Sequence, residues 1–184
     1  MELDRRHFLS GIGATALAIS LDPRAALAQA PGDAQLAQVF DRIFAGDLLL
    51  NPAQRTSLGL DTGENAPARA LLGLSGKPAD LADARHARAS LAMVRGVDPT
   101  GLSEVWSVRR DVVQHMLEQR LVSEPFGVRH VGAPYRLSQQ DGAYFSVPDF
   151  LDSTHPIENA DDAEAYLSRL AQFSSAIVEE SEAQ

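Results

Sequence analysis

The sequence predicts a mainly α-helical fold, and two observations indicate it. Several stretches of the chain repeat apolar residues at the three-and-four spacing that gives a helix one apolar face. Clusters of proline and glycine, which end helices and form turns, separate these stretches. At 184 residues, with 45% hydrophobic and 22% charged side chains, the chain has the length and composition of a globular domain with its own core.

The first thirty residues have the features of an export signal and are set aside from the fold. A pair of arginines followed by Phe-Leu resembles the twin-arginine export signal. The four matching residues are Arg5, Arg6, Phe8 and Leu9. Asp4 and Ser10 depart from that pattern, so the alternative is an ordinary secretory signal that happens to hold two arginines.

The apolar core of this signal is too short to anchor the protein in a membrane. It runs from Phe8 to Leu21, about 14 residues, whereas a membrane-spanning helix needs roughly 20. Ala26 and Ala28 then form an A-x-A cleavage pattern, so we expect a signal peptide of residues 1–28, cut after Ala28 or, alternatively, after Ala30. The protein is therefore expected to use the export machinery and to be periplasmic or secreted.

The mature chain opens with a predicted helix from Asp33, as its N-cap, to Leu50, because apolar residues follow helical spacing along this stretch. Asn51 and Pro52 then interrupt the chain. Pro52 suits the first turn of a short second helix at residues 53–58, because a helix needs no backbone donor there.

Residues 61–80 are rich in glycine and proline and predict a loop around a short helical patch at 68–72. Helical spacing returns over residues 81–94, with arginines and a histidine on the polar faces. A turn at 98–101 separates this helix from the next one.

Two further helices are predicted on either side of a long proline-rich segment. The first follows a cap at Thr100 or Ser103 and ends near Leu121, and the second follows a cap at Asn159 or Asp161. The first carries a broad apolar face, made of Leu102, Val105, Trp106, Val112, Val113, Met116 and Leu117. We expect this face to be buried, which makes that helix a core helix.

The segment between these helices, residues 123–158, has prolines and glycines too closely spaced for a regular element. It also holds five aromatic residues, Phe126, Tyr135, Tyr144, Phe145 and Phe150. An irregular connection of this length is unusual, so we expect it to be functional or to wrap over another part of the protein.

Charge and cysteine content exclude several classes of function. The formal net charge is −9, which argues against nucleic acid as a partner because phosphate recognition needs a basic surface. The chain has no cysteine, so disulfide scaffolds, thiol catalysis and Cys-ligated metal sites are excluded.

No complete catalytic, cofactor-binding or metal-binding motif can be assigned from the residues alone. The mature histidines are His86, His115, His130 and His155, and none belongs to an H-E-x-x-H zinc motif. His115 and Glu118 share a helical spacing, but two residues alone are more typical of a surface contact than of a metal site. Residues 73–78 depart from the phosphate-loop pattern at both ends, and no serine-nucleophile motif is present.

Motifs along the mature chain resemble the N-terminal half of a bacterial family of unknown function, the domain-of-unknown-function 885 family. The matching stretches are Pro134-Tyr135-Arg136-Leu137-Ser138-Gln139-Gln140-Asp141-Gly142-Ala143-Tyr144-Phe145, Val147-Pro148-Asp149-Phe150-Leu151, His155-Pro156-Ile157, and Asp162-Ala163-Glu164-Ala165-Tyr166-Leu167-Ser168-Arg169-Leu170. The predicted helix at 33–50, followed by Asn51-Pro52, resembles the start of those proteins.

This resemblance implies that residues 31–184 are the N-terminal helical part of a larger, helical, zinc-peptidase-like fold. The complete protein would then be a zinc-dependent peptidase or related hydrolase, and the chain itself would be a truncated, inactive fragment without zinc. The alternative is a self-contained periplasmic helical module for binding or interaction. Within the fragment hypothesis, four polar residues of the 123–158 segment would line the cleft for a peptide substrate, unless the segment is a purely structural wrap. These are Ser138, Gln139, Gln140 and Tyr144.

Overall fold

The computed structural model describes residues 30–122, 124–126 and 135–183, and the fold of this part of the chain is mainly helical, as predicted. No strand occurs within these ranges. The elements are α1 (Pro31–Leu50), α2 (Pro52–Ser57), η3 (Gly63–Ala70), α3 (Gly76–Arg95), η4 (Pro99–Gly101), α4 (Glu104–Val122), η5 (Glu124–Phe126), α5 (Ala143–Ser153) and α6 (Ala160–Glu182). The predicted signal, including its arginine pair and the cleavage site at Ala26 and Ala28, lies outside the described residues.

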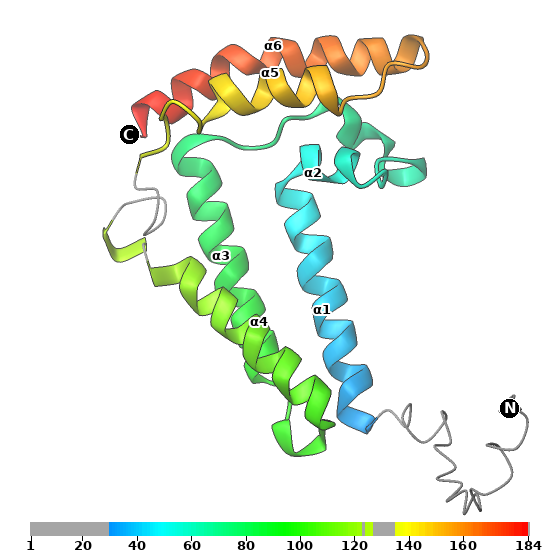
Figure 1. The fold of residues 1–184 in the computed structure, drawn as a ribbon, viewed down its shortest axis with the longest axis vertical. Helices are drawn as coiled ribbons and strands as arrows, with labels where there is room; N and C mark the ends of the chain where they lie inside the picture. Colours follow the sequence, from blue (N-terminus) through cyan, green and yellow to red (C-terminus); the bar gives the residue numbers. More distant parts are fainter. Residues whose placement is uncertain (1–29, 123, 127–134, 184) are drawn as a thin grey trace, which may run out of the picture.

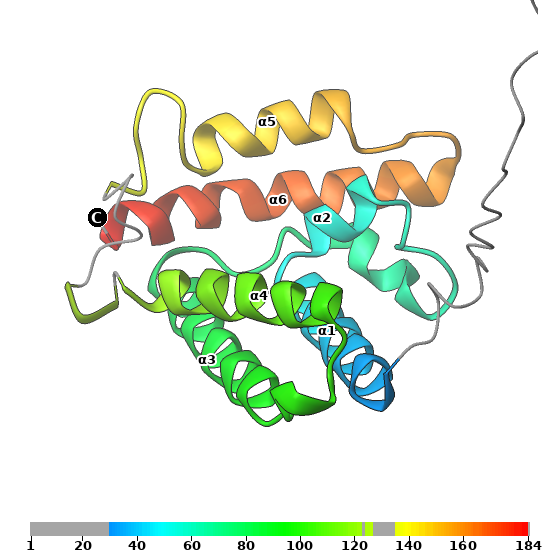
Figure 2. The same cartoon turned by 60° about the horizontal axis from the view of Figure 1, so that its bottom comes forward.

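The helices form two layers (Figures 1 and 2). Helices α5 and α6 lie side by side in one layer, and α1, α3 and α4 pack together in the other. The short elements α2 and η3 lie where the layers meet, and η3 packs against both α2 and α6. A membrane-crossing helix, judged by length and apolar character, is not found in the described ranges.

The predicted start of the first helix is corrected by three residues, because Ala30 and not Asp33 is the N-cap and Pro31 occupies the first turn. Asp33 nevertheless stabilises the first turn of α1 through its side chain. Its carboxylate accepts hydrogen bonds from the Ala30 backbone nitrogen (3.1 Å) and from the Ser103 backbone nitrogen (2.9 Å). The buried Asp33 therefore joins the start of α1 to the start of α4.

The main core lies between α1, α3 and α4, and α4 enters it by one face. Its buried members are Leu36, Val39, Ile43, Ala87, Leu91, Val94, Val97 and Leu117, with Trp106, Val113 and Leu121 of α4 packed at the edge. The expectation that the whole apolar face of α4 is buried was wrong. Four apolar residues of α4 are each more than half exposed, namely Val105, Val108, Val112 and Met116. The helix is apolar over more of its circumference than its neighbours can cover, and these four follow helical spacing as one stripe.

The expectation that residues 123–158 hold no regular element was also wrong, because α5 lies within this segment. Gly142 precedes α5 with a φ of 100°, a conformation that favours glycine, and a Cβ there would lie 2.4 Å from a Leu137 methyl carbon. Apolar residues four apart then face α6 and form a second core. Its buried members are Ala143, Val147, Leu151 and Ala176. This packing outweighs the helix-breaking preference of Pro148, whose ring lies on the exposed side.

Two other boundaries differ from the prediction. Residues 63–70 form the 3-10 helix η3, and α3 begins at Gly76, five residues before the predicted start at 81. Gly76 has a φ of +60°, and a Cβ there would lie 2.4 Å from the backbone oxygen of Glu179 in α6. This glycine therefore lets the start of α3 approach α6 closely. The predicted cap of the last helix is confirmed, since Asn159 accepts a hydrogen bond from the Asp162 backbone nitrogen (3.0 Å).

Candidate functional site

A cleft of about 1000 Å³ lies where the layer of α5 and α6 meets the ends of α1 and α3. Its lining comes from segments far apart in sequence, including α1, α2, the start of α3, Arg120 at the end of α4, Arg136, α5 and α6. Apolar side chains form part of the walls, among them Phe44, Leu72, Val147 and Phe150. A mixed apolar and polar concavity of this size is typical of a ligand site.

Arg120 brings charge to one side of the cleft. Its guanidinium donates a hydrogen bond to Asp47 of α1 (3.0 Å) and two to Asp83 of α3, the longer of which is 3.4 Å. Burial lowers the pKa of Arg120, but the two carboxylates outweigh it and raise the pKa above its ordinary value. His86 Nε2 lies 3.3 Å from the same Asp47 oxygen. These contacts tie α1, α3 and α4 together at the rim of the cleft.

Arg136 brings charge to the other side, where it joins α3 to α6. This buried side chain donates hydrogen bonds to the Ala183 carbonyl (2.9 Å), the Gly76 carbonyl (3.4 Å) and Asp80 (2.8 Å). Glu180 of α6 accepts a hydrogen bond from the Ala143 backbone nitrogen at the start of α5 (2.6 Å). The two sides together present charged groups of both signs around apolar walls.

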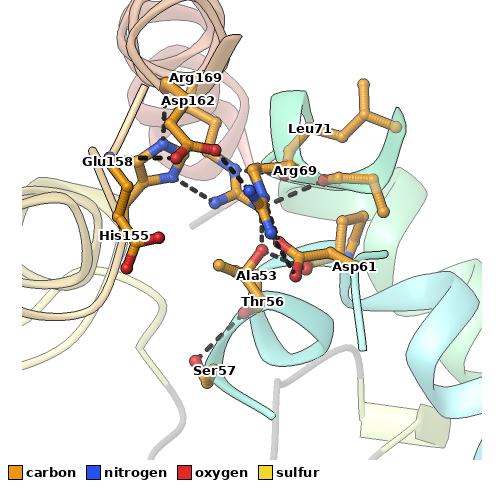
Figure 3. Close-up of polar contacts among 12 residues, drawn as sticks. Ala53, Thr56, Ser57, Asp61, Arg69, Leu71, His155, Glu158, Asp162 and Arg169 are labelled. Atoms are coloured by element: carbon orange, nitrogen blue, oxygen red, sulfur yellow. Dashed lines mark hydrogen bonds and ion pairs between the residues drawn. The ribbon is translucent and has the colours of Figure 1, made fainter. Parts of the chain in front are cut away.

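A buried polar network fixes the wall of the cleft that α2 forms, and Arg169 of α6 is its centre (Figure 3). Arg169 has no exposed surface. Its guanidinium donates to His155 Nδ1 (2.7 Å), to the Thr56 hydroxyl (2.7 Å) and to the carbonyls of Ala68 (3.1 Å) and Leu71 (3.0 Å). Burial lowers the pKa of Arg169 to about 10, so the side chain is still charged at neutral pH.

His155 takes one tautomer in this network. Its Nδ1 atom accepts the hydrogen bond from Arg169, so its Nε2 atom carries the proton and donates to the Asp162 carbonyl (3.1 Å). The imidazole is therefore a structural acceptor for Arg169.

Arg69 extends the network to two buried carboxylates. It donates to Asp61 at 2.9 and 3.2 Å, and it forms a second ion pair with Asp162. Burial raises the pKa of the Asp61 carboxyl, but hydrogen bonds from Arg69 and Thr56 outweigh it and leave the pKa below its ordinary value. A hydrogen bond from the Glu158 backbone and the contact with Arg69 likewise lower the pKa of Asp162.

The network and the cleft share α2 and α5. Thr56 of α2 accepts from Arg169, while Ala53, Gln54 and Ser57 of the same helix line the cleft. On the other side, Arg169 lies 4.8 Å from the ring centre of Phe150, which also lines the cleft. The network therefore sets the positions of two cleft walls. Its polar groups form hydrogen bonds and ion pairs with one another.

The four residues predicted to line a substrate cleft lie on an exposed turn before and at the start of α5. The Ser138 hydroxyl donates to Asp141 (2.8 Å), and the Tyr144 hydroxyl donates to the Ser138 carbonyl. Gln139 and Gln140 are exposed. None of the four lines the cleft described above, and their role in a longer protein stays a prediction.

The residues that do build the site were missed in the sequence, although one signal was present. Arg169 stands four residues after Ala165 and seven before Ala176, so it occupies the buried face of α6. A charged residue on a buried face needs polar partners, so this position in the sequence indicates a buried polar network.

Of the histidines, His130 lies outside the described residues. Within the described ranges, no group of three or more potential ligands is placed to hold a metal ion.

Fold and site together define a class, a mainly helical protein with an amphipathic cleft between two helical layers. Residues 52–184 match the model of a family described as "Bacterial protein of unknown function (DUF885)". The chain belongs to this family, which confirms the resemblance seen in its motifs. No curated protein and no solved structure matches the chain.

Proposed function

We propose that the chain is the helical, cleft-forming N-terminal part of an exported hydrolase that resembles zinc-dependent peptidases, and that its cleft receives peptides. The observation that carries this proposal is the cleft of about 1000 Å³ between the two layers. Its volume is at the upper end of the range for ligand pockets, and its lining combines apolar side chains with a similar share of polar and charged ones. A peptide presents the same mixture along its backbone and side chains.

The described residues do not fit a zinc site, because no three potential ligands meet within them. No catalytic step is therefore assigned to them. In this proposal they contribute binding and orientation of the substrate, and the reaction itself needs groups supplied by other residues of the complete protein.

Exposed apolar surface supports the view that the chain packs against further protein. Besides the stripe on α4, three large apolar residues of α6 are exposed, namely Leu167, Leu170 and Val178. Apolar surface of this kind commonly marks an interface. The same stripe on α4 also favours the second candidate, a self-contained periplasmic interaction module.

The two candidates differ in what the gene encodes after Gln184. A continued reading frame that contains an H-E-x-x-H helix is expected for the hydrolase. A stop codon directly after Gln184 in the intact gene would favour the module. For either candidate, the export proposal predicts a mature protein that begins near Gln29 in the periplasm.

Peptide binding in the cleft is tested with two matched substitutions in α5. Ser146 and Ser153 are both exposed, and each hydroxyl donates to the carbonyl four residues earlier, but only Ser146 lines the cleft. Ser146→Trp should fill part of the cleft and weaken binding by about tenfold, whereas Ser153→Trp should leave it unchanged. The measurement is fluorescence anisotropy of labelled octapeptides of mixed sequence. Equal binding by both variants, or no saturable binding by the unaltered protein, would contradict the proposal.

A further inference from the structure

The charged groups that line the cleft do not balance. Four carboxylates face two guanidinium groups, so the cleft has an excess of two negative charges. The carboxylates belong to Asp47, Asp80, Asp83 and Glu180, and the guanidinium groups to Arg120 and Arg136. A concave site with low-dielectric walls focuses the field of such an excess and raises the local concentration of cations.

Both arginines are already occupied by the protein. Arg120 donates to Asp47 and Asp83, and Arg136 donates to Asp80 and to two backbone carbonyls. Neither guanidinium is therefore free to bind an anionic group of a ligand without breaking contacts between elements.

Two of the carboxylates, in contrast, keep an oxygen for a ligand. Asp47 uses Oδ1 for both Arg120 and His86, and Glu180 uses Oε2 for the Ala143 backbone nitrogen. Asp47 Oδ2 and Glu180 Oε1 have no direct hydrogen-bond partner among the described residues, and the charge of Glu180 also acts on Arg136 from a longer distance. These two acceptors lie in the lining of the same cleft, one on α1 and the other on α6.

We infer that the cleft selects peptides with a basic side chain, whose cation would be attracted by the carboxylates of the lining, at Asp47 on one side or at Glu180 on the other, while its apolar neighbours contact Phe44 and Phe150. This inference rests on the proposed function and adds the class of peptide. The net charge of the whole chain, −9, acts in the same direction by attracting cationic ligands.

The test compares three fluorescein-labelled octapeptides that differ at one central position, which is arginine, its neutral isostere citrulline, or glutamate. Binding to the full chain is followed by fluorescence anisotropy. The arginine peptide should bind about fivefold more tightly than the citrulline peptide, and the glutamate peptide more weakly than either. The ratio of the two affinities, arginine peptide over citrulline peptide, is called here the advantage of arginine. It should decrease as ionic strength rises from about 0.02 M to about 0.3 M, because salt screens the charges.

Substitutions at neighbouring positions of α6 locate the effect. Glu180→Gln removes one negative charge from the cleft but keeps an oxygen for the Ala143 nitrogen, so it should reduce the advantage of arginine by about two- to threefold. Glu179→Gln makes the same change of charge at an exposed residue outside the lining and should leave the advantage unchanged. Asp47→Asn is the second variant in the cleft and should act like Glu180→Gln.

The outcomes separate the two proposals. If the citrulline and arginine peptides bind equally, or if Glu179→Gln lowers the advantage as much as Glu180→Gln, the basic-peptide inference is overturned and peptide binding in the cleft still stands. If none of the three peptides binds saturably, the proposed function itself fails. Circular dichroism of each variant shows that a change in binding does not come from loss of the fold.

Discussion

Arg169 is a fully buried cation whose direct partners are neutral. An imidazole, a hydroxyl and two carbonyls accept its hydrogen bonds, and Asp61 adds electrostatic attraction from a longer distance. Leaving several buried acceptors without a donor would be costly, because each loses its hydrogen bond without regaining water. Arg169 is therefore a positioning residue for the cleft walls.

Asp61 makes the stability of the fold depend on pH. Its folded-state pKa lies below the ordinary value of about 3.9, so the unfolded chain binds a proton more readily. The stabilisation is complete well above pH 4 and is lost as the pH falls through the folded-state pKa. Asp61→Asn should lower the free energy of unfolding by about 1–3 kcal/mol at pH 7, and the difference from the unaltered protein should shrink below about pH 4.

Urea denaturation at pH 7 and at acidic pH measures this difference. Asp111→Asn is the control, because Asp111 is an exposed aspartate with one long contact to Arg110 (3.5 Å), and surface pairs of this kind contribute little. If the difference in free energy of unfolding between Asp61→Asn and the unaltered protein stays constant as the pH falls, the charge of the Asp61 carboxylate is not the source of the stabilisation.

At the scale of single elements, the sequence predicted those helices whose ends carry clear signals. Pro52 and Asn159 each mark a helix start, and both starts are present in the structure. The prediction failed at α5, because closely spaced prolines and glycines indicate a loop there, whereas the apolar residues at 143, 147 and 151 pack against α6 and stabilise a helix. It failed in part at α4, because an apolar pattern shows which side chains favour burial but not whether enough protein is present to cover them.

The hydrogen-bond network around Arg169 could not be predicted from the sequence, for a different reason. Its members come from α2, η3, α6 and the turn after α5, and one of its hydrogen bonds joins residues 113 positions apart. Local spacing holds no information about such pairs. The cleft was not predicted either, because its lining is set by how the two layers meet.

Pro148 offers a test at this scale. It lies in the interior of an 11-residue helix and is exposed, so Pro148→Ala should restore a backbone donor for the Tyr144 carbonyl without leaving a cavity. We expect the free energy of unfolding to rise by about 1–2 kcal/mol. Alanine is more favourable than proline inside a helix, but the unfolded chain also gains conformational entropy when proline is removed, which offsets part of that stabilisation. A thermal or urea unfolding curve measures the change, and a loss of stability would show that the proline ring has a packing role.

At the scale of the whole molecule, the described part of the chain has two separate cores. One lies between α1, α3 and α4, and the other between α5 and α6. The contacts of Arg169 and Arg136 connect the two layers. The relation of the layers, and with it the shape of the cleft, therefore depends on polar contacts more than on a shared apolar core.

Leu151→Ala tests whether these contacts make the two cores unfold together. Leu151 is buried in the second core, so its truncation should cost about 2–4 kcal/mol. The single tryptophan, Trp106, packs against the first core and reports on it by fluorescence. If the molecule unfolds as one unit, the urea midpoint seen by Trp106 fluorescence and by circular dichroism should fall together. An unchanged Trp106 midpoint would show that the layers unfold independently.

The bond between Arg169 and Thr56 also bears on the order of events during folding. Contacts between residues so distant in sequence close late, because the entropy of closing a long loop opposes them until other contacts are formed. Helices α1, α3 and α4 can associate through nearer neighbours while α6 is still being synthesised. The α2 wall of the cleft becomes fixed only after α6 has been made, so the ability to bind a ligand there is acquired later than the packing of α1, α3 and α4.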